Sequence, residues 1–260
     1  MAILVNENSR VIIQGITGRE GVVRAQLMKD YGTKLVAGVT PGRAGQDVYG
    51  VPVYDSVLQA WEKQGPIDVS VIFVPDEKGA QFVGPNTLGL VSPGKAVLGM
   101  IGGRAERARE WFRPGPIGVS SRSGGMTSAI SYYLTKAGLG LSTIVHVGGD
   151  AVIGLSHPEI MALFEHDPET RMAVMFGEIG TTQEERVADL VETGRFTKPL
   201  FAYIGGKAAK SGTRFSHAVA IVEGTRGSYE TKVKRLREVG VHVVDAISDI
   251  HAKAKEVLGA

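Results

Sequence analysis

A glycine-rich turn at residues 15–21, with the sequence GITGREG, is the first stretch whose residue types could bind a ligand. It follows an apolar run at 11–13 and precedes a helix-like stretch, so we expect a strand, a turn and a helix. Glycine lets the backbone approach a ligand, and the unpaired N–H groups of a helix N-terminus bind phosphate. The first two glycines are three residues apart, which departs from G-x-G-x-x-G. A tight turn without a ligand therefore remains an alternative.

A second turn, at residues 38–43 (GVTPGR), carries a basic residue where a dinucleotide site often has an acidic one. An acidic residue there would hold the ribose 2′-hydroxyl of NAD. Arg43 suits a ligand with an additional phosphate instead, which disfavours an NAD-dependent oxidoreductase. A solvated loop arginine is the alternative interpretation.

A third strand–turn–helix pattern, at residues 119–126 (VSSRSGGM), offers another oxyanion site. Ser123 suits a helix N-cap, and the N–H groups of Gly124 and Gly125 can point at an anion. A capped helix start accounts for Ser123 but not for the double glycine. Glu178 also stands at the carboxyl end of an apolar run, where open α/β sheets hold ligands, although a glutamate at a strand end is common.

The histidines do not form a metal-binding pattern such as H-x-x-x-H, so we expect no metal site in this chain. His217 lies in a polar, glycine-containing loop just before an apolar segment, which makes it the candidate functional histidine. A plain loop histidine is the alternative. A G-x-S-x-G elbow and a Walker A sequence are both missing, which argues against the corresponding hydrolases and nucleotide-binding proteins.

The elements that must position these residues alternate along the chain as short apolar runs and helix-like stretches. Runs such as 71–74 and 172–176 are apolar on both faces, as strands in helix-covered parallel sheets are. The alternation occurs in both halves and predicts two α/β domains. Gly and Pro gather at residues 84–116, which we predict to form a linker.

Composition narrows the function further. The 260 residues suit one large or two modest domains, and 43% hydrophobic residues suffice for a core. The absence of Cys excludes disulfides, thiolate-bound zinc, iron–sulfur clusters and cysteine nucleophiles. The net charge of +2 comes without a basic run, so we expect no nucleic-acid partner. We find neither a signal peptide nor an apolar run near the ~20 residues that span a bilayer, so we expect a soluble, cytoplasmic protein without a membrane partner.

Taken in order, these motifs resemble the alpha subunits of the succinyl-CoA synthetase family and its NDP-forming acyl-CoA ligase relatives. The resemblance runs nearly end to end, and parts of it also resemble ATP-citrate lyase. It implies an α/β protein with an N-terminal Rossmann-like CoA-binding domain (residues 1–116) and a flavodoxin-like ligase domain (117–260). The matching segments are residues 14–21, 31–34, 38–43, 84–86, 121–124, 148–150, 177–180, 198–199 and 216–218.

The resemblance also implies a reaction. In this family a beta-type partner with an ATP-grasp domain, which binds ATP or GTP with Mg²⁺, phosphorylates a histidine that matches His217. The phosphoryl group then passes to a small carboxylate, and the thiolate of CoA attacks the acyl phosphate. The resemblance thus implies an acid–thiol ligase, working as an alpha–beta hetero-oligomer, whose substrate is a di- or tricarboxylate such as succinate, malate or citrate.

Site roles follow from the same resemblance. Glu178 matches the carboxylate that orients the histidine in this family. A phosphoryl group would be cradled at Ser123, Gly124 and Gly125. The positions that match CoA contacts are Thr17, Gly18, Arg19, Glu20 and Arg43.

The chain departs from the family in four places. A strand–helix–strand unit of roughly thirty residues is missing between Val83 and Gly84, either through a deletion or, as we favour, through an omitted segment. Ser216 and Val219 replace the glycines beside the histidine. Ser128 and Ala129 replace a Tyr-Glu pair of the succinate enzymes, and Arg43 replaces a lysine. These departures leave a non-catalytic CoA-binding or regulatory protein as the alternative, whereas retention of both His217 and Glu178 favours the enzyme.

Overall fold

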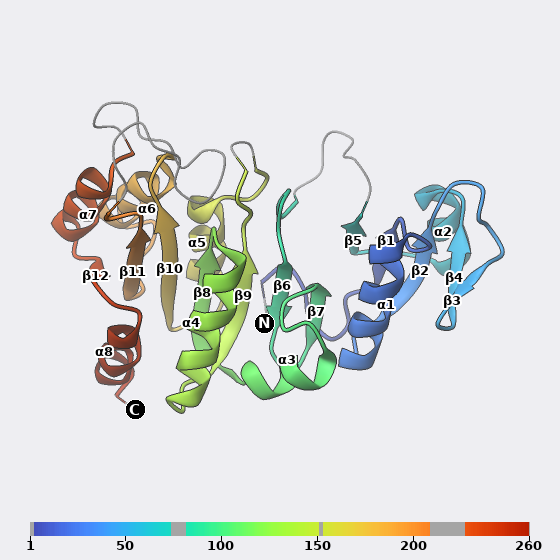
Figure 1. The fold of residues 1–260 in the computed structure, drawn as a ribbon, viewed down its shortest axis with the longest axis horizontal. Coiled ribbons are helices and arrows are strands. Elements are labelled where there is room, and N and C mark those ends of the chain that lie inside the picture. The colour runs from blue at the N-terminus through green and yellow to red at the C-terminus, as the bar shows by residue number, and fades with distance from the viewer. Residues whose placement is uncertain (1–2, 74–81, 151–152, 209–226, 260) are drawn as a thin grey trace.

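A computed structural model describes residues 3–73, 82–150, 153–208 and 227–259 of the chain. Its strands form two sheets that lie one after the other along an elongated molecule, as Figure 1 shows. None of the helices in the described ranges has the length and apolar character that crossing a bilayer requires.

The first sheet has five strands in the order β3-β4-β2-β1-β5, and all pairs but β3–β4 are parallel. Without β3, this strand order is that of one half of a Rossmann sheet. Its switch point, the place where the strand order reverses and where ligands bind in such sheets, lies between β1 and β5. Ile12 and Ile13 are both fully buried, so the sheet is covered on both faces. The strands are β1 (Val11–Gln14), β2 (Leu35–Val39), β3 (Asp47–Val48), β4 (Val51–Tyr54) and β5 (Val69–Ile72).

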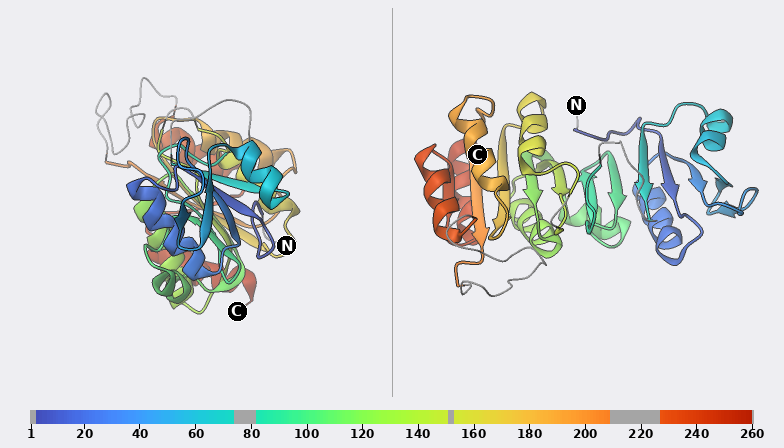
Figure 2. Two further views of the ribbon diagram at one scale, coloured as in Figure 1. Left: turned by 90° about the vertical axis from the view of Figure 1, so that its right-hand side faces the viewer. Right: turned by 90° about the horizontal axis from the view of Figure 1, so that it is seen from above.

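Two helices flank this sheet on opposite faces, as Figure 2 shows from above. Helix α1 (Arg19–Tyr31) buries Ala25 and Met28 in the large core that includes Ile13, and it ends at Gly32 in the left-handed conformation. Helix α2 (Val57–Gln64) begins at the N-cap Ser56 and packs Ala60 against Ile12. Helices on both faces are what a parallel sheet needs.

The second sheet has seven strands in the order β12-β11-β10-β8-β9-β6-β7. Its five parallel strands, taken in chain order, follow the 2-1-3-4-5 order of flavodoxin, with the switch point between β8 and β10. Strands β9 and β10 are buried along their whole length. The strands are β6 (Gly89–Ser92), β7 (Ala96–Gly99), β8 (Pro114–Ser121), β9 (Leu141–His146), β10 (Met172–Glu178), β11 (Leu200–Gly205) and β12 (His242–Val244).

The remaining helices cover this second sheet. Helix α6 packs against both α5 and α7, whereas α4 packs against both α3 and α8. They are α3 (Ala105–Trp111), α4 (Gly124–Lys136), α5 (His157–His166), α6 (Gln183–Glu192), α7 (Tyr229–Glu238) and α8 (Ser248–Leu258).

The predicted linker at residues 84–116 is wrong. Strands β6 and β7 form an antiparallel hairpin there, and β6 also pairs with β9, so the hairpin extends the second sheet. Pro93 and Gly94 form its turn, where Gly94 has a φ of +77°. Helix α3 follows and packs against α1. A domain boundary at residue 116 stays a prediction, although sheet pairing alone groups the hairpin with the second sheet.

Candidate active site and CoA site

The turn between β1 and α1 leaves the start of the helix open. Gly18 is the N-cap and makes no side-chain cap, and Gly18, Arg19 and Glu20 are exposed. An added side chain at Gly21 would collide with the carbonyl oxygen of Gly15, so the helix lies directly on the turn. The uncapped N–H groups of α1 can therefore receive an anion.

The neighbouring turn after β2 brings Arg43 to the same edge of the first sheet. The amide N–H groups of Arg43 and Ala44 each donate to Asp55 Oδ1 over 3.0 Å, which holds this loop. The amide of Thr17 lies 3.5 Å from Thr40 Oγ1, so the two turns are adjacent. The exposed guanidinium of Arg43 has no hydrogen bond or ion pair with any described residue. The five predicted CoA residues thus lie in two adjacent turns, after β1 (Thr17, Gly18, Arg19 and Glu20) and after β2 (Arg43), at the carboxyl edge of the first sheet.

The start of α4 forms the second candidate site, at the carboxyl end of β8. Ser123 is the N-cap, and its Oγ accepts from the Met126 amide at 3.4 Å. The hydroxyl of Ser121 donates to Ser123 O over 2.9 Å, which fixes the turn. A side chain added at Gly125 would meet no atom within 4 Å, so space remains above this helix N-terminus. The N–H groups of this helix start are thus accessible to an anion.

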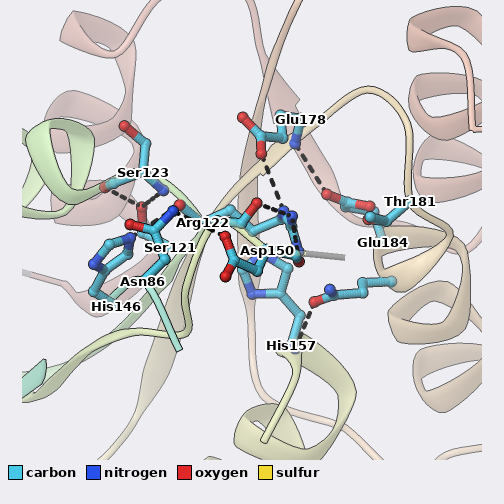
Figure 3. A network of polar contacts seen from close by, with 12 residues as sticks. Asn86, Ser121, Arg122, Ser123, His146, Asp150, His157, Glu178, Thr181 and Glu184 are labelled. Carbon is cyan, nitrogen blue, oxygen red and sulfur yellow. Dashed lines mark hydrogen bonds and ion pairs between the residues drawn. The ribbon is translucent and has the colours of Figure 1, made fainter. Parts of the chain in front are cut away.

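Arg122 joins the ends of three adjacent strands beneath this turn, as Figure 3 shows. Its Nε lies 3.1 Å from Glu178 Oε1, and both side chains are buried. Its Nη2 donates to the carbonyl oxygens of Gly149 (3.1 Å) and Asp150 (3.2 Å). The guanidinium therefore fixes the loop after β9 and the end of β10 relative to the Ser123 turn.

His146, at the end of β9, holds the same turn from the other side. Its Nδ1 accepts from the Leu88 amide at 2.7 Å, so the proton must lie on Nε2, which donates to Arg122 O over 2.9 Å. The Asn86 amide group donates to Asp150 Oδ1 over 3.0 Å. The loop before β6 is thus attached to the end of β9 and to the loop that follows it, and His146 links it to Arg122.

A second layer of charge lies behind Glu178. Its backbone amide donates to Glu184 Oε1 over 3.0 Å, and Glu184 Oε2 lies 2.5 Å from the ammonium of Lys232. The side chains of Glu184 and Lys232 are both fully buried. Burial raises the pKa of the Glu184 carboxyl, but the Lys232 ammonium, His157 and the hydrogen bonds to the carboxylate together outweigh burial, and the pKa lies below its ordinary value.

His157, the first residue of α5, lies under this layer and is fully buried. Its Nδ1 is 2.7 Å from Ser120 Oγ. Burial lowers the pKa of His157 to about 4, so the imidazole is neutral near pH 7. The buried pairs Arg122–Glu178 and Lys232–Glu184 therefore balance without it, and Lys232 also contacts the partly exposed Glu185.

The structure gathers the predicted residues into two groups. Ser123, Gly124 and Gly125 follow β8 and Glu178 ends β10, so they stand at the switch point of the second sheet, and the five predicted CoA residues lie in the turns that follow β1 and β2 of the first sheet or in the first turn of α1. His217 lies outside the described residues. The described ranges contain no cluster of three or more His, Asp or Glu side chains that could hold a metal ion. Sequence reasoning did not assign roles to the buried side chains Arg122, His157, Glu184 and Lys232.

Family models match both halves of the chain. The CoA binding domain model matches residues 6–83, and the succinyl-CoA ligase like flavodoxin domain model matches residues 114–256. The chain belongs to the succinate–CoA ligase alpha-subunit family. This membership confirms the predicted Rossmann-like and flavodoxin-like fold, and it confirms the predicted class of enzyme, an acid–thiol ligase that needs a beta subunit.

Curated relatives in this family extend over the whole chain. The succinate–CoA ligase [ADP-forming] subunit alpha 2 of Archaeoglobus fulgidus is 39% identical and is aligned over 99% of this chain and all of its own length. Subunit SauD of the ADP-forming sulfoacetate-CoA ligase of Bilophila wadsworthia is 38% identical over the full length of both chains. The first alignment has 296 positions against 260 residues, so at least 36 positions of that relative face a gap.

Solved structures share the fold. ATP citrate lyase of Methanosaeta concilii, in complex with (3S)-citryl-CoA, superimposes with a TM-score of 0.86 over 99% of this chain at 20% identity. This chain spans about half of that protein, 50% of its length. A dinucleotide forming acetyl-coenzyme A synthetase of Ca. Korarchaeum cryptofilum has a TM-score of 0.65 at 16% identity. The likeness to citrate lyase is thus one of architecture.

Proposed function

We propose that this chain is the alpha subunit of an NDP-forming ligase that joins a small di- or tricarboxylic acid to CoA through a phosphohistidine at His217 and an acyl phosphate. The observation that carries the proposal is that the α4 N-terminus, with open space beside Gly125, and the buried carboxylate of Glu178 stand at the ends of the adjacent strands β8 and β10 and are joined through Arg122. Family membership supports the same reaction.

In this proposal each group at the second switch point has a distinct task. The α4 N-terminus stabilises the transferring phosphoryl group with its free N–H groups and its dipole. Glu178 orients the imidazole of His217. A neutral imidazole is nucleophilic toward the phosphoryl donor, and the phosphorylated form readily gives the group to a carboxylate oxygen.

CoA would bind at the first switch point. The uncapped start of α1 at Thr17, Gly18, Arg19 and Glu20 would take a phosphate of CoA, and Arg43 would pair with another. The CoA-binding family model, which matches residues 6–83, covers all of these positions.

The acid substrate is proposed from the named relatives and from α4. Succinate and sulfoacetate, the acids named for two relatives, each carry a carboxylate and a second acidic group. Ser128 and Ala129, in place of the Tyr-Glu pair of succinate enzymes, argue for a different acid of this class. CoA-dependent release of nucleoside diphosphate with succinate, malate, citrate and sulfoacetate in parallel would identify it.

The partner in this proposal is a beta-type ATP-grasp subunit that holds ATP or GTP with Mg²⁺. The decisive experiment purifies the chain together with its native partner and incubates the complex with labelled nucleoside triphosphate. We expect an acid-labile phosphoryl group on the His217 peptide, absent from a His217→Ala variant that still binds CoA. A phosphorylated alanine variant would refute the role of His217.

A non-catalytic CoA-binding protein is the second candidate, because relatives contain at least 36 aligned positions that this 260-residue chain lacks. The strand β5 also forms an edge of its sheet with Ile72 42% exposed. A chain that binds CoA, purifies without a partner and carries no phosphate would establish this second candidate instead.

A further inference from the structure

Lys232 places a buried positive charge behind the candidate active site. It lies in the first turns of α7, and its side chain is fully buried. Its ammonium lies 2.5 Å from Glu184 Oε2 and 2.8 Å from Glu185 Oε2, and it also donates to the carbonyl oxygen of Thr181. All three donor positions of the ammonium are therefore used within the loop and helix that follow β10.

These contacts continue to Glu178. Glu184 bonds Lys232 with one carboxylate oxygen and accepts the backbone amide of Glu178 with the other, at 3.0 Å. Glu178 in turn pairs with Arg122. In Figure 3, Glu184 lies on one side of Glu178 and Arg122 lies on the other side of Glu178. Two ion pairs joined by a backbone hydrogen bond thus connect α7 to the turn that begins α4.

Close packing holds the Glu184 side chain in place against β10. A side chain added at Gly177 would collide with the Glu184 side chain, so the glutamate lies flat against β10. Gly180 also donates to the carbonyl oxygen of Gly227, just before α7. A displacement of Glu184 would therefore move the end of β10, where Glu178 stands.

We infer, on the basis of the proposed function, that Lys232 is a positioning residue for Glu178 in phosphoryl transfer. It neutralises Glu184, so that Glu184 can remain buried as the acceptor for the Glu178 amide. Without the ammonium, the buried carboxylate loses its ion-pair partner, and while it is charged it turns toward water. This movement removes or weakens the contact that fixes Glu178.

A purely stabilising role accounts less well for this pair. Buried ion pairs are often replaceable by apolar residues of similar volume with no loss of stability, because desolvation offsets the attraction. The feature that an apolar pair would lack is an acceptor for the Glu178 amide. We therefore expect the geometry of Glu178, and not the fold, to depend on the pair.

The test uses the alpha–beta complex and the initial rate of phosphoryl incorporation at His217 from labelled nucleoside triphosphate. We expect Lys232→Met to lower this rate about 10- to 100-fold, the loss typical of a misplaced catalytic group. The double variant Lys232→Met/Glu184→Gln should return to within about threefold of wild type, because the neutral carboxamide oxygen introduced at position 184 still accepts the Glu178 amide without a cation. Lys234→Met, with a side chain 79% exposed on the same helix, is the matched control and should leave the rate unchanged.

The dependence of the phosphorylation rate on pH distinguishes a positioning role of Lys232 from a packing role. In Lys232→Met the titratable groups that remain around Glu184 are His157 and Glu185, and Glu178 stays paired with Arg122; the double variant retains all of them and so controls for their titration. Burial then raises the pKa of Glu184, so lowering the pH favours its neutral form and removes the uncompensated charge. The rate of the single variant, relative to wild type, should rise as the pH is lowered, whereas that of the double variant should not.

An unchanged rate in Lys232→Met, or a double variant as slow as the single one, would overturn the inference. If the single variant does not fold, the double variant decides: a rate near wild type supports the role of charge balance, and a loss of about tenfold or more refutes it. Wild-type complex that takes up no phosphate at His217 would refute the proposed function itself, which is a different outcome.

Discussion

Arg122 and Glu178 form a buried ion pair across the switch point of the second sheet, with Nε 3.1 Å from Oε1 and side chains only 0% and 2% exposed. Arg122 follows β8 and Glu178 ends β10, and no other strand lies between these two. The pair therefore sets the distance between the turn that begins α4 and the carboxylate proposed to orient His217.

Removing the arginine should cost much stability. Arg122→Met removes the cation that pairs with the buried Glu178 carboxylate and frees the carbonyl oxygens of Gly149 and Asp150, so we expect a loss of about 3–5 kcal/mol in the free energy of unfolding. Urea unfolding followed by circular dichroism measures it. Arg186→Met breaks an exposed pair with Glu159 and should change stability by less than about 1 kcal/mol. Equal effects of the two substitutions would contradict the importance of the buried pair.

The two glycines at the start of α4 should respond differently to alanine. A side chain at Gly124 would meet Leu88 and His146, so Gly124→Ala should destabilise the protein by about 1–3 kcal/mol. Gly125 faces open space, so Gly125→Ala should leave the melting temperature nearly unchanged. The same methyl group would occupy the proposed phosphoryl site and slow phosphorylation of His217 about tenfold. Normal phosphorylation of folded Gly125→Ala would exclude this glycine from the site.

The sequence allowed the parallel sheets to be predicted because their strands are apolar on both faces, as in β10. It did not reveal the β6–β7 hairpin. Pro93, Gly94 and the glycines at both ends of the hairpin are typical of a linker, yet Pro-Gly is also what a tight turn requires. Only pairing with β9, which lies about fifty residues further along the chain, distinguishes the two, and pairing at that distance leaves no local pattern.

The site was predictable where it depends on strand ends and glycines, as at Ser123 and Glu178. It was not predictable where it depends on buried charge. In a helix pattern Lys232 and Glu184 resemble members of a solvated face, and their burial follows from the packing of α6 against α7. Arg122 stood inside a recognised motif, and a charge directly after an apolar strand was the signal that could have identified it.

Arg43 provides a test of the CoA site that does not depend on catalysis. If its guanidinium pairs with an additional phosphate, Arg43→Ala should weaken CoA about tenfold, the loss of one charge-assisted contact, and should weaken dephospho-CoA little. Isothermal titration of both ligands measures the difference, with the exposed Arg186→Ala as control. Equal losses for the two ligands would remove the phosphate role of Arg43.

His157 should give the protein a dependence of stability on pH. Its pKa is about 4 in the folded protein and 6.5 when unfolded, so between these values the unfolded chain binds more protons and stability falls as pH falls. The full contribution to the free energy of unfolding, about 3 kcal/mol, is present above pH 6.5 and is lost toward pH 4.

The variant His157→Asn keeps a polar group near Ser120 but cannot titrate. We expect this variant to be less stable near pH 7 and to lose less stability than wild type between pH 6.5 and 4, as measured by urea unfolding at several pH values. His166→Asn, at an exposed position on the same helix, should retain the wild-type slope. Identical slopes for wild type and His157→Asn would show that the buried imidazole does not titrate as proposed.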